Sequence, residues 1–175
     1  MADIYEKIKL SRSNIRPTAS DYVKAIFEDF HELHGDGKTG EDKAVIGGIG
    51  LLCDIPVTVI ATEKGKNIEE RIERNFGFAN ASGYGKALRL MKQAEKFGRP
   101  VITFVDTQGA DCKEESERNG IARTIAETIA ESTKLRTIVL SVITGEGGSG
   151  GALAFATADK VFMTENAYYS VITPE

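Results

Sequence analysis

The stretch that decides the fold of this chain is Ser141-Val142-Ile143-Thr144-Gly145-Glu146-Gly147-Gly148-Ser149-Gly150-Gly151-Ala152-Leu153-Ala154-Phe155-Ala156. Its pattern predicts a β-branched strand, a glycine-rich loop and a short apolar helix. Glycine can adopt positive φ and lets a ligand approach the backbone. The N–H groups at a helix start favour negative charge. The stretch therefore predicts a cradle for an oxyanion that develops during a reaction; the alternative is a tight turn where a buried helix crowds a strand.

Length and composition limit the classes of protein to consider. A chain of 175 residues favours one domain with a proper hydrophobic core. Its 41% hydrophobic and 27% charged residues are typical of soluble globular proteins, and the net charge of −4 argues against nucleic-acid binding as a primary function. We expect no membrane span, because no long apolar run occurs, and no signal peptide, because the N-terminal stretch 1–7 lacks an apolar central region. The expected location is the cytoplasm.

The cysteines and histidines do not indicate a metal site. Cys53 and Cys112 are far apart and no CxxC occurs, so we expect two free thiols and no bound metal. His31 and His34 are the only histidines. They could form a metal pair, but no third ligand is apparent nearby, and a solvated helix end is favoured.

Hydrophobic spacing predicts alternating strands and helices. Ranges 44–52 and 55–61 form a hairpin pattern, and Gly47, Gly48 and Gly50 suggest a bulged or closely approached strand. The other expected strands are 101–106, 137–143, 160–163 and 169–172, and the expected helices are 18–34 (N-cap Ser20), 82–97 and 115–133.

This order implies an α/β layered core with right-handed crossovers. The loops 106–111 and 144–151 leave successive strands, so they are candidates for one shared site. Range 63–77 is a charged loop. Its basic residues could meet phosphates, but the interleaved glutamates favour a solvated face; these residues are Lys64, Lys66, Arg71 and Arg74.

Several motifs together resemble one family, the α subunits of bacterial acetyl-CoA carboxylase carboxyltransferase. The motifs are Arg74-Asn75-Phe76-Gly77, the tyrosine–lysine segment 83–92, Phe104-Val105-Asp106-Thr107-Gln108-Gly109-Ala110, the glycine stretch 145–154 and Tyr169-Ser170-Val171-Ile172-Thr173-Pro174-Glu175. The resemblance begins near Thr18. It implies a crotonase (ClpP/crotonase-like) fold, a spiral of ββα units. We expect an N-terminal helical arm at residues 1–42 and a carboxyltransferase domain at 43–175.

The resemblance also implies a reaction. Such a carboxyltransferase moves a carboxyl group from carboxybiotin, held on a separate biotin carboxyl carrier protein, to acetyl-CoA. The product, malonyl-CoA, is used in fatty acid biosynthesis. In this family the α subunit mainly receives the biotin side, whereas a β subunit with a zinc ribbon mainly binds CoA. A hetero-oligomer without metal in this chain is therefore expected.

Carried over residue by residue, the resemblance places Gly147, Gly148, Gly150 and Gly151 in the oxyanion loop as catalytic residues. Gly109 and Ala110 would line the same pocket and bind substrate; a role as packing or turn residues stays open for both. No side chain is assigned as general base. Glu146 is the one candidate carboxylate, and capping of the loop is an equally good explanation for it.

The chain departs from the family pattern in two places. Gln108 stands where the family usually has proline, and residues 111–114 replace an aromatic, glycine-rich segment. The family also continues beyond the 169–175 motif, so the domain is expected to lack its C-terminal part.

Two other classes of function remain open. Ser149 fits the G-x-S-x-G turn of a serine hydrolase, although no histidine follows His34. A non-catalytic scaffold with the crotonase fold is the second alternative.

Overall fold

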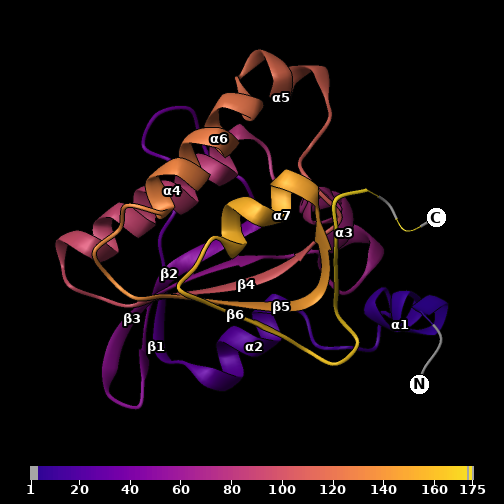
Figure 1. The fold of residues 1–175 in the computed structure, drawn as a ribbon, viewed down its shortest axis with the longest axis horizontal. Coiled ribbons are helices and arrows are strands. Elements are labelled where there is room, and N and C mark those ends of the chain that lie inside the picture. The colour runs from indigo at the N-terminus through magenta and orange to yellow at the C-terminus, as the bar shows by residue number, and fades with distance from the viewer. Residues whose placement is uncertain (1–3, 173, 175) are drawn as a thin grey trace.

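The structure is a computed structural model that describes residues 4–172 and residue 174, and it shows one sheet with helices on both faces (Figure 1). Residues 1–3, 173 and 175 lie outside the described residues. They belong to the outer ends of the two expected regions, 1–42 and 43–175, and Thr173 and Glu175 are also part of the last family motif. The elements are α1 (Ile4–Ser11), α2 (Ala19–Ile26), β1 (Glu28–Glu32), β2 (Val45–Leu52), β3 (Ile55–Thr62), α3 (Ile68–Glu73), the 3₁₀ turn η1 (Asn75–Gly77), α4 (Ala81–Lys96), β4 (Val101–Thr107), α5 (Glu114–Arg118), α6 (Ile121–Ser132), β5 (Val139–Gly148), α7 (Ser149–Ala156), β6 (Lys160–Met163) and β7 (Tyr168–Ser170).

The sheet has the order β1-β2-β3-β4-β5-β6 in the described part of the chain, and β7 pairs with the end of β5. The predicted hairpin is confirmed: β2 and β3 are antiparallel and joined at Cys53-Asp54. Both turn residues have positive φ, as in the turns that match strand twist. Strands β3, β4, β5 and β6 run parallel, with helices in the crossovers. Their carboxyl ends therefore meet at one edge.

Each face of the sheet packs against its own helices. Helices α4, α6 and α7 cover one face, and α2 covers the other (Figure 1). Every residue of β4 is buried, because the strand lies between these two layers. The apolar core thus fixes the positions at which β4 and β5 end.

The prediction of one helix over 18–34 is wrong. Helix α2 begins after Thr18, not Ser20, and ends at Ile26. His31 lies on β1 and His34 just after it, so neither is at a helix end. Residues 28–32 pair with β2 as a strand instead of continuing the helix. A Cβ on Gly48 would lie 2.3 Å from the carbonyl oxygen of His31. The glycines of β2 therefore allow close approach, as the sequence suggested.

The prediction of a single helix over 115–133 is also wrong. Gly120, at φ 74°, separates α5 from α6. The strand predicted over 137–143 continues to Gly148, so the first glycines of the expected loop are strand residues. Over the described ranges 4–172 and 174, none of the helices combines the length and apolar character needed to cross a bilayer.

Candidate active site

The two loops expected to share a site do lie side by side. Strands β4 and β5 are parallel neighbours, and beyond a register shift Thr107 pairs with Gly147. Residues 108–110 then run against the start of α7. This confirms the predicted adjacency of loops 106–111 and 144–151, at the carboxyl ends of two central strands.

The glycines of this stretch are required because backbones pack closely here. A Cβ on Gly148 would lie 1.8 Å from the carbonyl oxygen of Gln108. A Cβ on Gly151 would lie 2.5 Å from the amide nitrogen of Ala110 and 2.7 Å from the carbonyl carbon of Gly109. We call this contact, formed by Gly148 and Gly151 against residues 108–110, the glycine wall. It brings together four of the six residues that the resemblance selected, whereas a Cβ on Gly147 would instead meet Tyr168 and Tyr169.

Positive φ is not the reason for these glycines, contrary to the expectation from sequence. Gly147, Gly148, Gly150 and Gly151 all lie outside the left-handed region, and the residue that adopts it is Ser149, at φ 53°. A Cβ on Gly150 would meet nothing closer than 3.9 Å. Gly150 therefore stands apart from the wall sterically, although its amide belongs to the first turn of α7.

Helix α7 starts without a side-chain cap. Its N-cap residue is Gly148, which has no side chain to accept from the first amides, and the first N–H groups of a helix have no partner within it. A cavity of about 590 Å³ adjoins this helix start and is lined by Gln108, Gly148, Ser149, Tyr168 and residues of the C-terminal segment. The site thus offers backbone donors to a ligand oxygen, with the helix dipole favouring negative charge.

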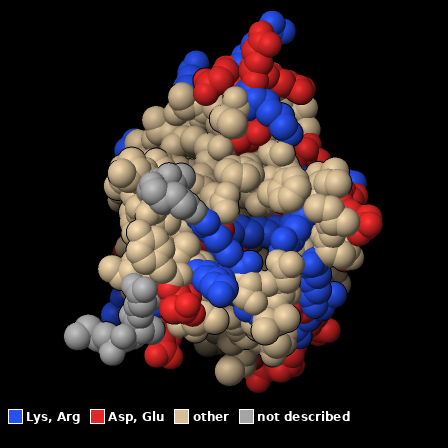
Figure 2. Space-filling view, turned by 90° about the vertical axis from the view of Figure 1, so that its right-hand side faces the viewer, with Lys and Arg blue, Asp and Glu red and all other residues tan. Residues whose placement is uncertain are grey.

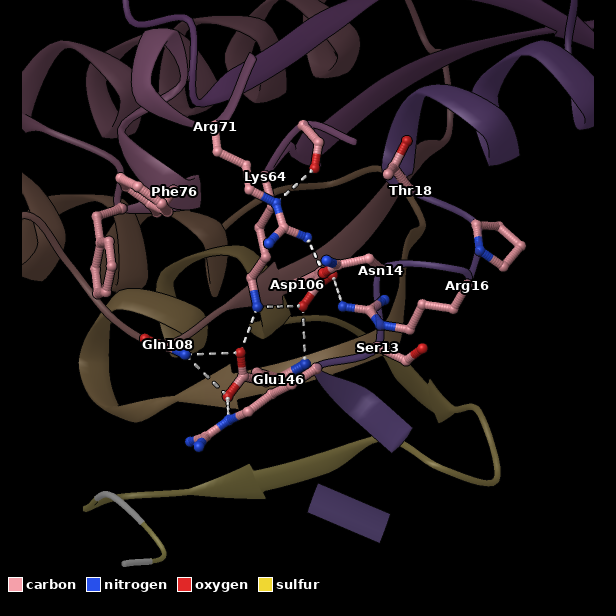
Figure 3. A pocket seen from close by; sticks show the side chains of 14 residues that line it. Ser13, Asn14, Arg16, Thr18, Lys64, Arg71, Phe76, Asp106, Gln108 and Glu146 are labelled. Carbon is pink, nitrogen blue, oxygen red and sulfur yellow. Dashed lines mark hydrogen bonds and ion pairs between the residues drawn. The ribbon is translucent and has the colours of Figure 1, made fainter. Parts of the chain in front are cut away.

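Glu146 is the most heavily bonded carboxylate beside the glycine wall. Its side chain is 1% exposed. It accepts from Lys64 Nζ at 2.5 Å (Figure 3). It also accepts from Arg12 Nε at 2.7 Å and from the Tyr168 hydroxyl at 2.7 Å. Gln108 Nε2 donates to it at 3.0 Å. The carboxylate therefore joins the N-terminal residues to the ends of β3, β4 and β5.

The ionisation of Glu146 follows from these contacts. Burial alone would raise its pKa, but the Lys64 ammonium and the hydrogen bonds from Lys64, Tyr168 and Arg12 lower that pKa to about 2. Burial and the bond to Glu146 raise the pKa of Tyr168 to about 12. At neutral pH Glu146 is a carboxylate that only accepts, which supports a structural rather than a proton-transferring role.

Asp106 extends the same network to the second arginine of the N-terminal segment. It pairs with Arg16 and lies 2.9 Å from Lys64 Nζ, and its Oδ1 accepts from the backbone amide of Glu146 at 2.9 Å. Arg12, Arg16, Lys64 and Arg71, together with Asp106 and Glu146, line a cavity of about 230 Å³, which we call the cationic recess. Figure 2 shows Lys and Arg gathered in a hollow on this face of the molecule.

Sequence analysis missed most of this recess. It assigned Lys64 to a solvated charged loop, yet the Lys64 side chain is 15% exposed and holds two carboxylates. Lys66, by contrast, is an exposed partner of Asp21. Arg12 and Arg16 come from the segment expected to form an N-terminal helical arm. Two signals were available: Glu146, a carboxylate inside a glycine run, and the alternative that Lys64 and Arg71 meet phosphates.

The serine hydrolase alternative lacks its base. Ser149 is exposed at the start of α7, and its positive φ matches a strained nucleophile turn. The two histidines of the sequence are His31 on β1 and His34 just after it. Strand β1 is separated from β5 by β2, β3 and β4. Neither His31 nor His34 is therefore placed to act on Ser149.

No grouping of metal-ligating side chains stands out in the structure. In residues 4–172 and 174, no group of three or more His, Cys, Asp or Glu is placed to hold a metal ion. Cys53 and Cys112 are both free thiols at the surface.

A solved structure with the same arrangement defines the class of fold. The chain is similar to the transcarboxylase 12S core, solved with methylmalonyl-coenzyme A and methylmalonic acid bound, with a TM-score of 0.73 and 19% identity over 87% of this chain and 29% of that one. The fold is thus the crotonase-like fold of carboxyltransferases, as predicted.

Sequence comparison identifies the family within this class. Residues 2–175 match the model of the acetyl co-enzyme A carboxylase carboxyltransferase-like family, and the chain belongs to that family. It is 56% identical over 171 residues to an acetyl-coenzyme A carboxylase carboxyl transferase subunit alpha of Clostridium botulinum (strain Eklund 17B / Type B), covering 98% of this chain and 62% of the relative. It is 50% identical to a Clostridium tetani protein named as carboxyl transferase subunits beta/alpha, covering 99% of this chain and 30% of that protein. The chain thus spans less than two thirds of the length of these relatives.

Proposed function

We propose that this chain contributes the biotin side of a carboxyltransferase, which moves a carboxyl group from carboxybiotin on a separate carrier protein to acetyl-CoA. The product is malonyl-CoA for fatty acid biosynthesis. Family membership supports this proposal. The structural observation that carries it is the uncapped start of α7, which lies beside a cavity and against the loop after β4.

The proposed role of each residue follows from its place. Carboxyl transfer leaves negative charge on the biotin ureido oxygen and on the thioester oxygen of the acetyl group, and fixed donors stabilise such charge. The amides of Ser149, Gly150 and Gly151 are the first donors of α7. Gly147 and Gly148 bring the end of β5 alongside the loop after β4. Gly109 and Ala110 pack against Gly151 from that loop, and their proposed role is to bind substrate beside it.

The proposal includes partners and a location. The carboxyltransferase β subunit, the biotin carboxyl carrier protein and acetyl-CoA are the proposed partners, in a cytoplasmic hetero-oligomer. The Clostridium tetani relative named as subunits beta/alpha supports the pairing with β. Co-elution of this chain with a β subunit in size-exclusion chromatography tests it. The division into an arm at 1–42 and a carboxyltransferase domain at 43–175 also stays a proposal.

The decisive experiment compares two substitutions at one position, one that removes the backbone N–H donor and one that keeps it. Gly150→Pro deletes an N–H within the first turn of α7, where proline is tolerated, and Gly150→Ala keeps that N–H in space open to a methyl group. We expect Gly150→Pro to lower malonyl-CoA formation by about 10²–10³-fold and Gly150→Ala to have little effect. The assay uses a complex with β subunit and carboxylated carrier.

Circular dichroism and the melting temperature must first show that both variants fold, because proline also restricts Ser149. Equal activity of folded Gly150→Pro and Gly150→Ala would contradict the oxyanion role of α7. Absence of any product in the wild-type complex would favour a non-catalytic scaffold.

A further inference from the structure

The cationic recess holds a cation that pairs with neither of its carboxylates. Arg16 and Lys64 pair with Asp106, and Lys64 also pairs with Glu146, whereas Arg71 lines the same cavity and forms no ion pair within residues 4–172 and 174. Glu63 is buried nearby, but it accepts from Ser20 and the amide of Gly65 instead of from a cation. Since such a cation on a cavity wall attracts anions, the recess favours a negatively charged occupant.

Two of the arginines retain donors for such an occupant. Arg71 donates Nη2 to Asn14 at 2.6 Å and Nε to the carbonyl of Gly65 at 3.2 Å, and in the described part of the chain it forms no ion pair with a carboxylate. Arg16 reaches Asp106 with Nη2, but its buried Nε has no hydrogen-bond partner within residues 4–172 and 174. Figure 3 shows both guanidinium groups on the wall of the same pocket.

An aromatic ring forms a further wall of the recess. Phe76 and Phe78 line it, and Phe76 is 43% exposed although its ring is large and apolar. Phe76 also has φ 55°, between Asn75 at 47° and Gly77 at 81°. A bulky residue in the left-handed region is costly, and such strain clusters at ligand clamps. The turn η1 therefore holds an exposed ring beside free guanidinium donors.

We propose that the cationic recess binds a small organic anion, with its carboxylate or phosphate group at Arg71 and Arg16 and its apolar part against Phe76. Bidentate guanidinium donors suit both kinds of oxyanion. The inference goes beyond the proposed function, because it assigns no step of carboxyl transfer to the recess. It is tested by binding alone, so the carboxyl-transfer proposal can fail without affecting it.

The test titrates the full chain with four probes by isothermal titration calorimetry at constant ionic strength. Benzoate and acetate are the aromatic and non-aromatic carboxylates, and phenyl phosphate and inorganic phosphate are the corresponding phosphates. Chloride is the control for binding of a simple anion. We expect saturable 1:1 binding of at least one aromatic probe, tighter than its non-aromatic counterpart. The preferred pair tells whether the site takes carboxylates or phosphates. Absence of saturable binding by all four probes overturns the proposal.

Three variants locate the binding. We expect Arg71→Gln to weaken binding at least about tenfold, as loss of a charge-assisted pair would. Phe76→Gly, which suits positive φ, should weaken only the aromatic probes. Arg74→Gln is the matched control, because Arg74 bonds the carbonyl of Lys43 outside the recess. Unchanged binding in Arg71→Gln, or equal weakening in Arg74→Gln, contradicts the assignment. If Arg71→Gln does not fold, Phe76→Gly decides: equal affinity of that variant and wild type for the aromatic probe that wild type binds overturns the proposal.

Discussion

The glycine wall and the cationic recess meet at Gln108 and Glu146, yet they are built by opposite means. The wall is made of backbone: Gly148 and Gly151 let two chain segments touch, and no charged side chain takes part. The recess is made of side chains from four separate parts of the sequence, held by ion pairs to Asp106 and Glu146. The wall should therefore respond to added volume, and the recess to lost charge.

The largest effect is expected from removing the carboxylate that joins the two regions. Glu146→Ala leaves Arg12, Tyr168 and part-buried Lys64 without their shared acceptor. We expect a loss of about 3 kcal/mol in the free energy of unfolding, at the lower end for a broken buried pair, because Lys64 keeps Asp106. Urea unfolding measures it. As control, Glu114→Ala breaks an exposed pair with Arg118 and should cost about 0.5 kcal/mol or less. Equal losses in both variants would show that the network does not stabilise the recess.

The same carboxylate predicts a pH dependence of stability. Because the folded state lowers the pKa of Glu146 from 4.5 to about 2, its contribution is complete above about pH 4.5 and is lost as the pH falls toward 2. Wild type should therefore lose stability more steeply below pH 4.5 than Glu146→Gln, which cannot titrate at this position. Urea midpoints from pH 7 to pH 3 compare the two proteins. Parallel curves would mean that Glu146 titrates normally in the folded chain.

The wall is tested by adding one methyl group at two neighbouring glycines. Gly148→Ala places a Cβ onto the carbonyl of Gln108 and should destabilise by about 1–3 kcal/mol or more. Gly150→Ala has open space and helical geometry, so it should stabilise by about 0.4–1 kcal/mol. Thermal unfolding of the two variants gives the comparison. A destabilised Gly150→Ala would mean that the wall extends further than the contacts indicate.

The smallest effect concerns Ser149, whose φ of 53° is unfavourable for any residue with a Cβ. Ser149→Gly removes that strain, while the greater freedom of glycine in the unfolded chain opposes the gain, so we expect a change within about 1 kcal/mol. Ser149→Ala keeps both the strain and the amide and should leave the proposed carboxyl transfer, assayed in a complex with β subunit and carboxylated carrier, nearly unchanged. If Ser149→Ala abolished activity in a folded complex, the hydroxyl and not the backbone would be the reactive group.

Local patterns determined how much could be predicted. The hairpin, α4, β4 and α7 follow from hydrophobic spacing and from Gly and Pro signals, and the loops that share the site follow from parallel strand order. The spacing of Val23, Phe27 and Phe30 is compatible with one long helix and also with a helix followed by a strand. The sequence pattern therefore predicts a single helix where the structure has α2 and β1. Pairing of β1 with β2 decided between them, and such long-range contact leaves no local signal.

In the site, too, the part that depends on a local motif was predictable and the part that depends on long-range contacts was not. Gly148 and Gly151 stand in a motif, so the wall was predictable, although positive φ was the wrong reason for it. Arg12 and Lys64 meet only through Glu146, far from both in sequence. Nothing adjacent to Arg12 marks it as a partner of the glycine run, and Lys64 stands among glutamates that suggested solvent.

The pairing of β7 with Glu146–Gly148 has a consequence for hydrogen exchange. A glycine run is usually the first part of a protein whose amides exchange with solvent. Here its first part, up to Gly148, is the end of a central strand, held by β4 on one side and by β7 on the other. The amides of this part that are bonded in the sheet can exchange only through an opening that also separates these strands, so the slowly exchanging core should extend to the edge of the site.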